Sequence, residues 1–177
     1  EAALNPFPVG KEIFLPGARP EAVESSSSSG SSRSGSSSKS SSAKVSSSSS
    51  RSFKWPVVGK INSPFGWRRH PVTRRRDFHT GIDIKAPRGR AIHAARGGRV
   101  EYSGWMGGYG RVVVIDHGDG HSTLYAHCSS LSVRKRQKVS QGQVIATVGT
   151  TGRTTGPHLH FEIRRGNKPV NPLGLLR

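Results

Sequence analysis

Apolar residues from Phe53 onward form short β-branched runs separated by glycine, and no window keeps a period of 3.6 residues. Short apolar runs bounded by turn residues are typical of strands. The pattern therefore predicts a mainly β domain built on an antiparallel sheet. The predicted strands cover residues 99–102, 111–116, 122–126, 144–148 and 158–163.

Glycine-rich segments mark the predicted turns between these strands. The tripeptide GDG at 118–120 predicts a hairpin turn, and the polar segment 149–156 predicts a long loop. Residues 129–140 surround a basic run and predict a loop with at most one helical turn. We therefore expect the chain to reverse through turns and loops, with almost no helix.

One segment differs from the rest of the chain in composition, because 20 of the 28 residues in 25–52 are serine. Such a segment has almost nothing to bury, so nothing offsets the entropy cost of ordering it. It predicts a disordered linker between a short N-terminal segment, 1–24, and a body, 53–177. The body is long enough to form one hydrophobic core.

The formal net charge of the chain is +18, and the body alone contains 22 Lys and Arg against 6 Asp and Glu. A field of this size attracts polyanions, whether nucleic acid, anionic lipid or cell-wall polymer. Aromatic residues make up only 7% of the chain, and the cations are not interleaved with a stacking platform. We therefore expect no specific nucleic-acid partner.

The chain contains a single cysteine, Cys128, which excludes a disulfide framework within the chain. No stretch is apolar for the ~20 residues that a membrane-spanning helix requires. We also recognise no signal peptide. We therefore expect no transmembrane segment in this chain.

The tripeptide His158-Leu159-His160 lies in a predicted strand, where residues two apart project to the same face. Both imidazoles then point one way, and Glu162 shares their face. Two histidines on a polar strand face can also be free of any ligand. The tripeptide alone leaves both interpretations open.

A second imidazole and a carboxylate, His79 and Asp83, lie four residues apart, which predicts one face of an extended segment. Two histidine nitrogens and one carboxylate oxygen suit catalytic zinc, because they leave the fourth position open for water. A structural site would normally be closed by cysteine, and only one thiol exists here. The residue types therefore predict a catalytic metal site.

Several blocks of the body, in their order and spacing, resemble one family of enzymes. They are FHTGIDI at 78–84, GGYG at 107–110, VVVIDH at 112–117, TLYAH at 123–127 and TGRTTGPHLHFE at 151–162, with SPFGWR at 63–68. The body is similar to the LytM/lysostaphin type of zinc metallopeptidase, peptidase family M23. The similarity covers nearly the whole body and none of the serine-rich segment.

The resemblance implies a mainly antiparallel β domain of the duplicated-hybrid-motif type with a zinc-containing groove. It implies that one Zn²⁺ per domain is bound by His79, Asp83 and His160. His127 and His158 are then left free of metal, and one acts as the general base while the other stabilises the oxyanion, in an order that stays open. Two further residues lie in predicted loops as candidates for substrate binding, Tyr109 and Arg153.

The resemblance further implies an endopeptidase that hydrolyses peptide bonds in the stems or cross-bridges of bacterial peptidoglycan. Its expected partners are peptidoglycan and anionic wall polymers, and its expected location is extracytoplasmic, secreted or bound to the wall. Residues 9–20 resemble the tail of a wall-binding module, so we interpret 1–24 as the remnant of one. The alternative is a non-catalytic M23-like scaffold, against which stands the presence of all five expected site residues.

Two other groups of residues invite a chemical interpretation. His117, Asp119 and His121 could form a second metal cluster, but they flank the predicted hairpin turn, where turn chemistry accounts for Asp119. Cys128 follows His127 and could be a nucleophile, but a lone buried thiol is usually inert packing. We expect neither group to carry chemistry.

Overall fold

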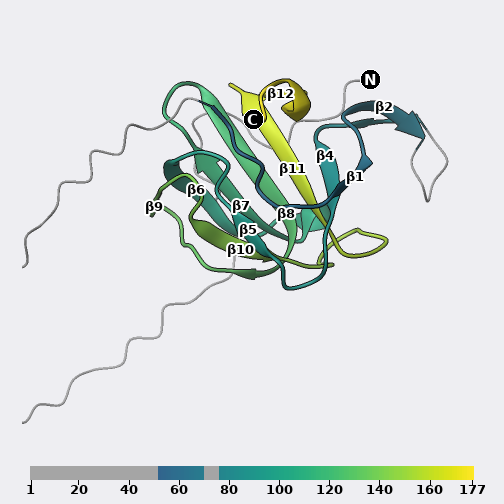
Figure 1. Cartoon of the computed structure of the whole chain (residues 1–177), viewed down its shortest axis with the longest axis horizontal. Helices are drawn as coiled ribbons and strands as arrows, with labels where there is room; N and C mark the ends of the chain where they lie inside the picture. The colour runs from purple at the N-terminus through teal and green to yellow at the C-terminus, as the bar shows by residue number, and fades with distance from the viewer. Residues whose placement is uncertain (1–51, 70–75) are drawn as a thin grey trace, which may run out of the picture. The chain divides into compact units, whose positions relative to one another are not determined.

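The computed structural model describes residues 52–69 and 76–177, and the regular secondary structure of this part of the chain is almost entirely β (Figure 1). The predictions for 1–24 and for the serine-rich segment fall outside it, Ser52 excepted. No helix of the described residues is long and apolar enough to cross a membrane. The elements are β1 (Lys60–Ser63), β2 (Gly66–Arg69), β3 (Arg76–His79), β4 (Ile82–Lys85), β5 (Ala91–His93), β6 (Gly98–Trp105), η1 (Gly107–Tyr109), β7 (Arg111–Asp116), β8 (His121–Leu131), β9 (Lys138–Val139), β10 (Val144–Val148), β11 (His158–Arg165), β12 (Lys168–Val170) and η2 (Pro172–Gly174).

Ten of these strands form one sheet, in which every pair is antiparallel. Its main path runs β1-β4-β11-β8-β7-β6-β9, while β10 pairs with β5 and β8, and β12 pairs with β11. Strands β2 and β3 form a separate two-stranded sheet. The predicted fold class, mainly β and antiparallel, is therefore confirmed.

The predicted strands all exist, with two sets of bounds reproduced. Strands β7 and β10 have the predicted limits, whereas β6, β8 and β11 are longer than predicted. The hairpin between β7 and β8 turns through Gly118–Gly120 as expected. The loop predicted for 129–140 is wrong at both ends, because β8 continues to Leu131 and β9 begins at Lys138.

Strand β11 divides its side chains between the core and the site. Leu159, Phe161 and Ile163 are completely buried in the main hydrophobic cluster. Burying a side chain of the size of Phe161 contributes about 1.5–3 kcal/mol. His158, His160 and Glu162 alternate with them and project from the opposite face, as period-2 geometry requires. Packing of the apolar face thus fixes the direction of the polar one.

Candidate active site

Three polar side chains from three strands converge at one end of the sheet. His79 ends β3, Asp83 lies on β4, and His160 lies on β11 directly opposite Asp83 in the strand register. His79 Nε2 lies 3.1 Å from Asp83 Oδ1 and 3.0 Å from His160 Nδ1, and His160 Nδ1 lies 2.9 Å from Asp83 Oδ1. All three side chains are buried, and we call them the groove cluster.

His79 and Asp83 do not belong to one extended segment, as their spacing predicted. The chain leaves β3 at His79, bends at Thr80 and Gly81, and enters β4 in the other sheet. A Cβ at Gly81 would lie 2.3 Å from the carbonyl oxygen of Phe161, so only glycine allows this bend to pass so close to β11. His79 and Asp83 therefore meet as predicted, but they meet because of this bend and not because they share one extended segment.

The remaining nitrogens of the two histidines determine which atoms face the centre. His79 Nδ1 donates to the carbonyl oxygen of Pro64 at 2.8 Å, and His160 Nε2 donates to Glu162 Oε1 at 3.0 Å. A carbonyl and a carboxylate can only accept, so these nitrogens carry the hydrogens. His79 Nε2 therefore turns a lone pair toward Asp83 Oδ1, and His160 Nδ1 does the same once it has released its proton. A hydrogen bond that fixes the tautomer in this way is typical of metal-binding histidines.

Three acceptor atoms so close together need a positive charge between them. A proton on His160 Nδ1 supplies it: burial lowers the pKa of His160, but hydrogen bonds to Asp83 and Glu162 outweigh this and raise it to about 9. Burial raises the pKa of Asp83, but hydrogen bonds from His160 and His79 hold it well below its usual range. A metal cation would satisfy the same three atoms. The donor set and its spacing thus fit Zn²⁺.

Among the residues whose role in the site the sequence did not predict, Glu162 is the most important. Its carboxylate is fully buried and accepts hydrogen bonds from His160, from the Tyr109 hydroxyl at 3.0 Å, from Thr80 Oγ1 and from Arg164 Nε at 2.7 Å. Burial raises the pKa of Glu162, but the bond to His160 and the charge of Arg164 lower it to about 2. A buried charge is tolerated only with such partners. Glu162 is therefore an ionised anchor for His160.

His127 faces the groove because of a β-bulge. The pairing of β8 with β7 shifts by one residue between Arg111↔Cys128 and Val113↔Tyr125, and His127 has φ 59°. A non-glycine residue in this left-handed region costs roughly 1–3 kcal/mol, and bulges re-aim side chains beside active sites. His127 Nδ1 donates to the Thr151 carbonyl at 2.8 Å, which leaves Nε2 with a lone pair. Burial lowers the pKa of His127 to about 4, so the ring is neutral near pH 7.

His158 lies beside His127, with 4.8 Å between the ring centroids. Its Nδ1 donates to the Gly156 carbonyl at 2.8 Å, and its Nε2 lies 3.8 Å from Asp83 Oδ1. Both rings thus have one nitrogen tied to the backbone and the other directed at the groove. Neither belongs to the groove cluster.

A groove of about 530 Å³ opens over these side chains. Tyr109 and Arg153 both line it, on opposing segments that are held together by the bond from Arg153 N to Gly108 O at 2.7 Å. The segments approach so closely that a Cβ at Gly110 would lie 2.4 Å from the Thr151 carbonyl carbon. The Tyr109 ring also packs 5.5 Å from the His160 ring, so this residue both lines the groove and supports the cluster.

The sequence model of peptidase family M23 matches residues 77–172. This stretch contains the groove cluster, both further histidines, and more than half of the chain. The chain belongs to peptidase family M23.

Individual M23 relatives cover most of the body. The chain is 47% identical over 119 residues to the DD-carboxypeptidase/endopeptidase Mpg of Neisseria meningitidis, and 42% identical over 126 residues to the murein hydrolase activator NlpD of Escherichia coli. These alignments cover 67% and 71% of this chain but only 27% and 31% of the two relatives. A solved zinc-containing peptidase from Vibrio cholerae superposes with a TM-score of 0.64 and 40% identity, covering 68% of this chain and 39% of that one.

Arg68 is a further groove residue of this M23 domain that the sequence did not single out. Its Nη1 lies 3.5 Å from Asp83 Oδ2 and donates to Ser63 Oγ at 2.6 Å. It therefore contacts the carboxylate oxygen that points away from the histidines. Only its place in the SPFGWR block could have drawn attention to it, and that block shows no local chemistry.

The thiol of the M23 domain is inert packing, as expected. Cys128 is completely buried in the main hydrophobic cluster, and burial raises its pKa to about 12. A thiol with so high a pKa carries no thiolate at neutral pH. The bulge turns His127 to the groove and leaves Cys128 in the core.

Proposed function

We propose that this M23 domain is a zinc-dependent endopeptidase that hydrolyses peptide bonds in the stems or cross-bridges of bacterial peptidoglycan. One observation carries the proposal: three converging acceptor atoms lie beside two imidazoles whose free nitrogens face the same groove. A catalytic zinc site needs both parts, an incomplete ligand set and neighbouring groups that move protons.

His79, Asp83 and His160 would hold one Zn²⁺ in this proposal. The bound ion would supply a Lewis acid and make water a nucleophile near neutral pH. Pro64 and Glu162 keep the two histidines in the tautomers that binding requires. Arg68 steadies the carboxylate of Asp83 from its other oxygen.

His127 and His158 would move the protons of the reaction. His127 is neutral at pH 7 and presents a free Nε2, so it can accept a proton from water. His158 presents its Nε2 beside Asp83, where it can donate to a developing oxyanion or to the leaving amine when protonated. Tyr109 and Arg153 line the walls of the groove and would contact the peptide.

The chain's surroundings follow from the same proposal. Peptidoglycan would be its partner, together with anionic wall polymers, and the domain would work outside the cytoplasm. The names of the relatives Mpg and NlpD support an action at the wall. The serine-rich segment would be a tether that lets the domain reach along an extended polymer.

A non-catalytic scaffold is the second candidate, and one observation favours it: a relative at 42% identity is named as an activator of murein hydrolases. A scaffold needs neither the ligand set nor the two free imidazoles. All five residues are present here and meet in one groove, which supports the enzyme.

Mass spectrometry of the products released from purified walls of different cross-bridge chemistry tests the proposal. We expect the full chain loaded with Zn²⁺ to release peptides that define one bond type, and His160→Ala to release none. A wild-type chain that binds zinc and releases nothing from any wall would support the scaffold instead. Undiminished activity of His160→Ala would overturn the metal assignment.

A further inference from the structure

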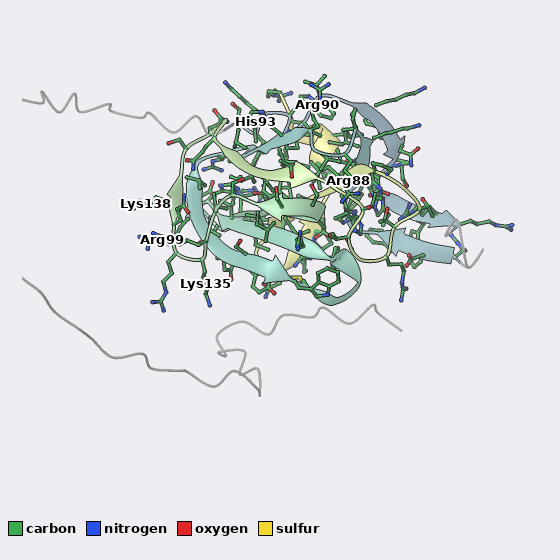
Figure 2. All side chains as sticks on the ribbon, turned by 90° about the horizontal axis from the view of Figure 1, so that it is seen from below. Arg88, Arg90, His93, Arg99, Lys135 and Lys138 are labelled. Atoms are coloured by element: carbon green, nitrogen blue, oxygen red, sulfur yellow. The ribbon has the colours of Figure 1, made fainter. Side chains whose placement is uncertain are left out.

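A second surface of the domain gathers cations that the proposed chemistry does not use. We call it the basic face, and Figure 2 shows its labelled side chains spread across one view of the domain. The face draws on the β4–β5 turn, on β5, β6 and β9, and on the β8–β9 loop. Its cations are Arg88, Arg90, Arg99, Lys135 and Lys138, and His93 belongs to the same face.

Backbone hydrogen bonds join these segments into one continuous surface. His93 Nδ1 donates to the carbonyl of Gly142, four residues beyond Lys138, and Ala94 N donates to the Gln143 carbonyl. Arg99 lies directly opposite Lys138 in the register of β6 and β9. The segments that carry the cations are therefore fixed relative to one another, although they come from distant parts of the sequence.

The charges of the basic face are not neutralised by the protein. Its Arg and Lys side chains are exposed, and none forms an ion pair with another described residue, whereas Arg68, Arg96 and Arg164 each pair with a carboxylate. Like charges directly opposite each other, such as Arg99 and Lys138, destabilise a sheet. Arg99 also lies opposite Asp116 in the register of β6 and β7, whereas the stretch that carries Lys135 and Lys138, from Gly120 to Phe161, contains no Asp or Glu. An external anion would relieve this repulsion.

The basic face also borders the loop that lines the groove. Gly89 N donates to the Val148 carbonyl, and Val148 N donates to the Arg90 carbonyl. Val148 ends β10 and leads directly into the loop that carries Arg153. Arg88 and Arg90 thus lie beside the base of this loop, and Lys138 and Lys135 lie at the far end of the face (Figure 2).

We propose that the basic face is an exosite that binds the free carboxylates of peptidoglycan stem peptides while the groove holds the bond to be cut. The inference rests on the proposed function, because it takes the wall as substrate. Peptidoglycan repeats its carboxylates along a polymer, so a row of cations that begins beside the base of the groove-lining loop matches it. Nucleic acid is the competing polyanion, and its binding is one of the outcomes that would overturn the proposal.

Sedimentation with insoluble purified walls at low salt tests the exosite. The full chain carrying His160→Ala is used, so that the walls are not consumed. We expect Arg99→Gln, Lys135→Gln and Lys138→Gln together to weaken wall binding by roughly tenfold, the sum of three exposed ion pairs. Salt should weaken binding of the parent more than that of the triple variant.

A matched triple variant separates a defined face from general charge. Lys54→Gln, Lys60→Gln and Lys168→Gln remove the same charge from exposed positions elsewhere on the domain. We expect it to bind walls within about threefold of the parent, because lone exposed charges contribute little. Equal weakening by both triples would overturn the exosite. The chain should not bind to walls whose carboxylates have been amidated, and binding to them would overturn the assignment to carboxylates. Tighter, salt-resistant binding to a DNA fragment would overturn it as well.

A soluble cross-linked peptide fragment of the wall completes the test, with chains that carry the native His160. The basic-face triple variant should cleave this fragment at the parent's rate, because no groove residue is changed, while it clears intact walls more slowly. Slower cleavage of the fragment would overturn the exosite. A parent that cleaves no fragment would refute the proposed function, whereas the wall-binding comparison would still decide the exosite.

Discussion

Two clusters in this domain contain two histidines and one aspartate, and they differ in what each histidine contacts. In the groove cluster, the second nitrogens of His79 and His160 converge on Asp83 Oδ1, where a cation can replace the proton on His160. In the turn cluster, His117, Asp119 and His121 flank the hairpin between β7 and β8. Residue types alone do not separate the two.

Two members of the turn cluster, His117 and Asp119, have already used their hydrogen-bonding groups. His117 Nδ1 donates to the Gly97 carbonyl at 2.9 Å, and its Nε2 accepts from Thr123 Oγ1 at 3.0 Å. Asp119 Oδ2 accepts from Arg96 Nη1 at 2.8 Å. His121 Nδ1 is buried 3.3 Å from Asp119 Oδ1 without a hydrogen bond. Burial lowers the pKa of His117, which further keeps this ring neutral. Within the described residues the groove cluster alone presents converging free acceptors. The partner of the second nitrogen, and not the presence of histidine, makes a candidate metal site.

His160→Ala should have the largest effect, since it removes one of three protein ligands. We expect the bound zinc to fall from about one ion per domain to near zero, and wall clearing to fall to background. Elemental analysis after dialysis and a turbidity assay measure the two quantities. Full zinc content in this variant would mean that the groove cluster is no more a zinc site than the turn cluster.

His127→Asn should lower kcat/KM by about 10²–10⁴-fold and leave zinc content unchanged, since it removes a proton-transfer group and no ligand. Asparagine is chosen because it tolerates the left-handed backbone at this position better than alanine. Steady-state kinetics on a soluble wall fragment checks the rate. Loss of zinc together with activity would mean that His127 is a ligand.

Glu162→Gln should weaken zinc binding by roughly 10–100-fold, because the amide no longer anchors His160 with a charge. Competition with a chromophoric chelator measures the affinity. Tyr109→Phe is the matched control: it removes one bond to the same carboxylate, so we expect at most about a tenfold change. A glutamine variant with wild-type affinity would show that the anchor is dispensable.

The affinity for Zn²⁺ should rise about tenfold per pH unit between pH 6 and pH 8. The pKa of His160 is raised to about 9, so the ring carries a proton throughout this range and must release it when a metal binds. Lower pH favours the proton and therefore weakens binding, and the slope should level off above pH 9. Zinc titrations at fixed ionic strength test this, and a flat profile would contradict it.

Asp119→Asn should have the smallest effect, a loss of about 1 kcal/mol in the free energy of unfolding with unchanged zinc content. The amide oxygen still accepts from Arg96, and the aspartate side chain is 43% exposed. Urea unfolding and elemental analysis measure the two quantities. A fall in zinc content would assign the turn cluster a metal after all.

The strands that the sequence predicted are those with apolar runs. Strand β7, RVVVID, is buried on both faces, and its bounds follow from composition alone. Strands β2 and β3, GWRR and RDFH, are short and charged, and nothing in them marks a strand before they pair with each other. Pairing is a tertiary property, so local pattern does not reveal it.

The sequence allowed the five candidate residues of the site to be selected, but not their geometry. Period-2 spacing placed His158, His160 and Glu162 on one face, which the structure reproduces. The turn of His127 could not be inferred, because its φ of 59° results from the different registers that neighbouring strands impose on β8. The role of Glu162 required knowing that Tyr109 and Thr80 lie against it.

His79 belongs to the separate two-stranded sheet, whereas Asp83 and His160 belong to the large one. An ion bound by all three would therefore crosslink the two sheets, as a disulfide links two segments, and would add to the contacts that Arg68 of β2 makes with Asp83 and Ser63. Removal of the ion by a chelator would then do more than abolish activity. It would allow β2 and β3 to open locally, and a protease added to the chelated protein would cut there first.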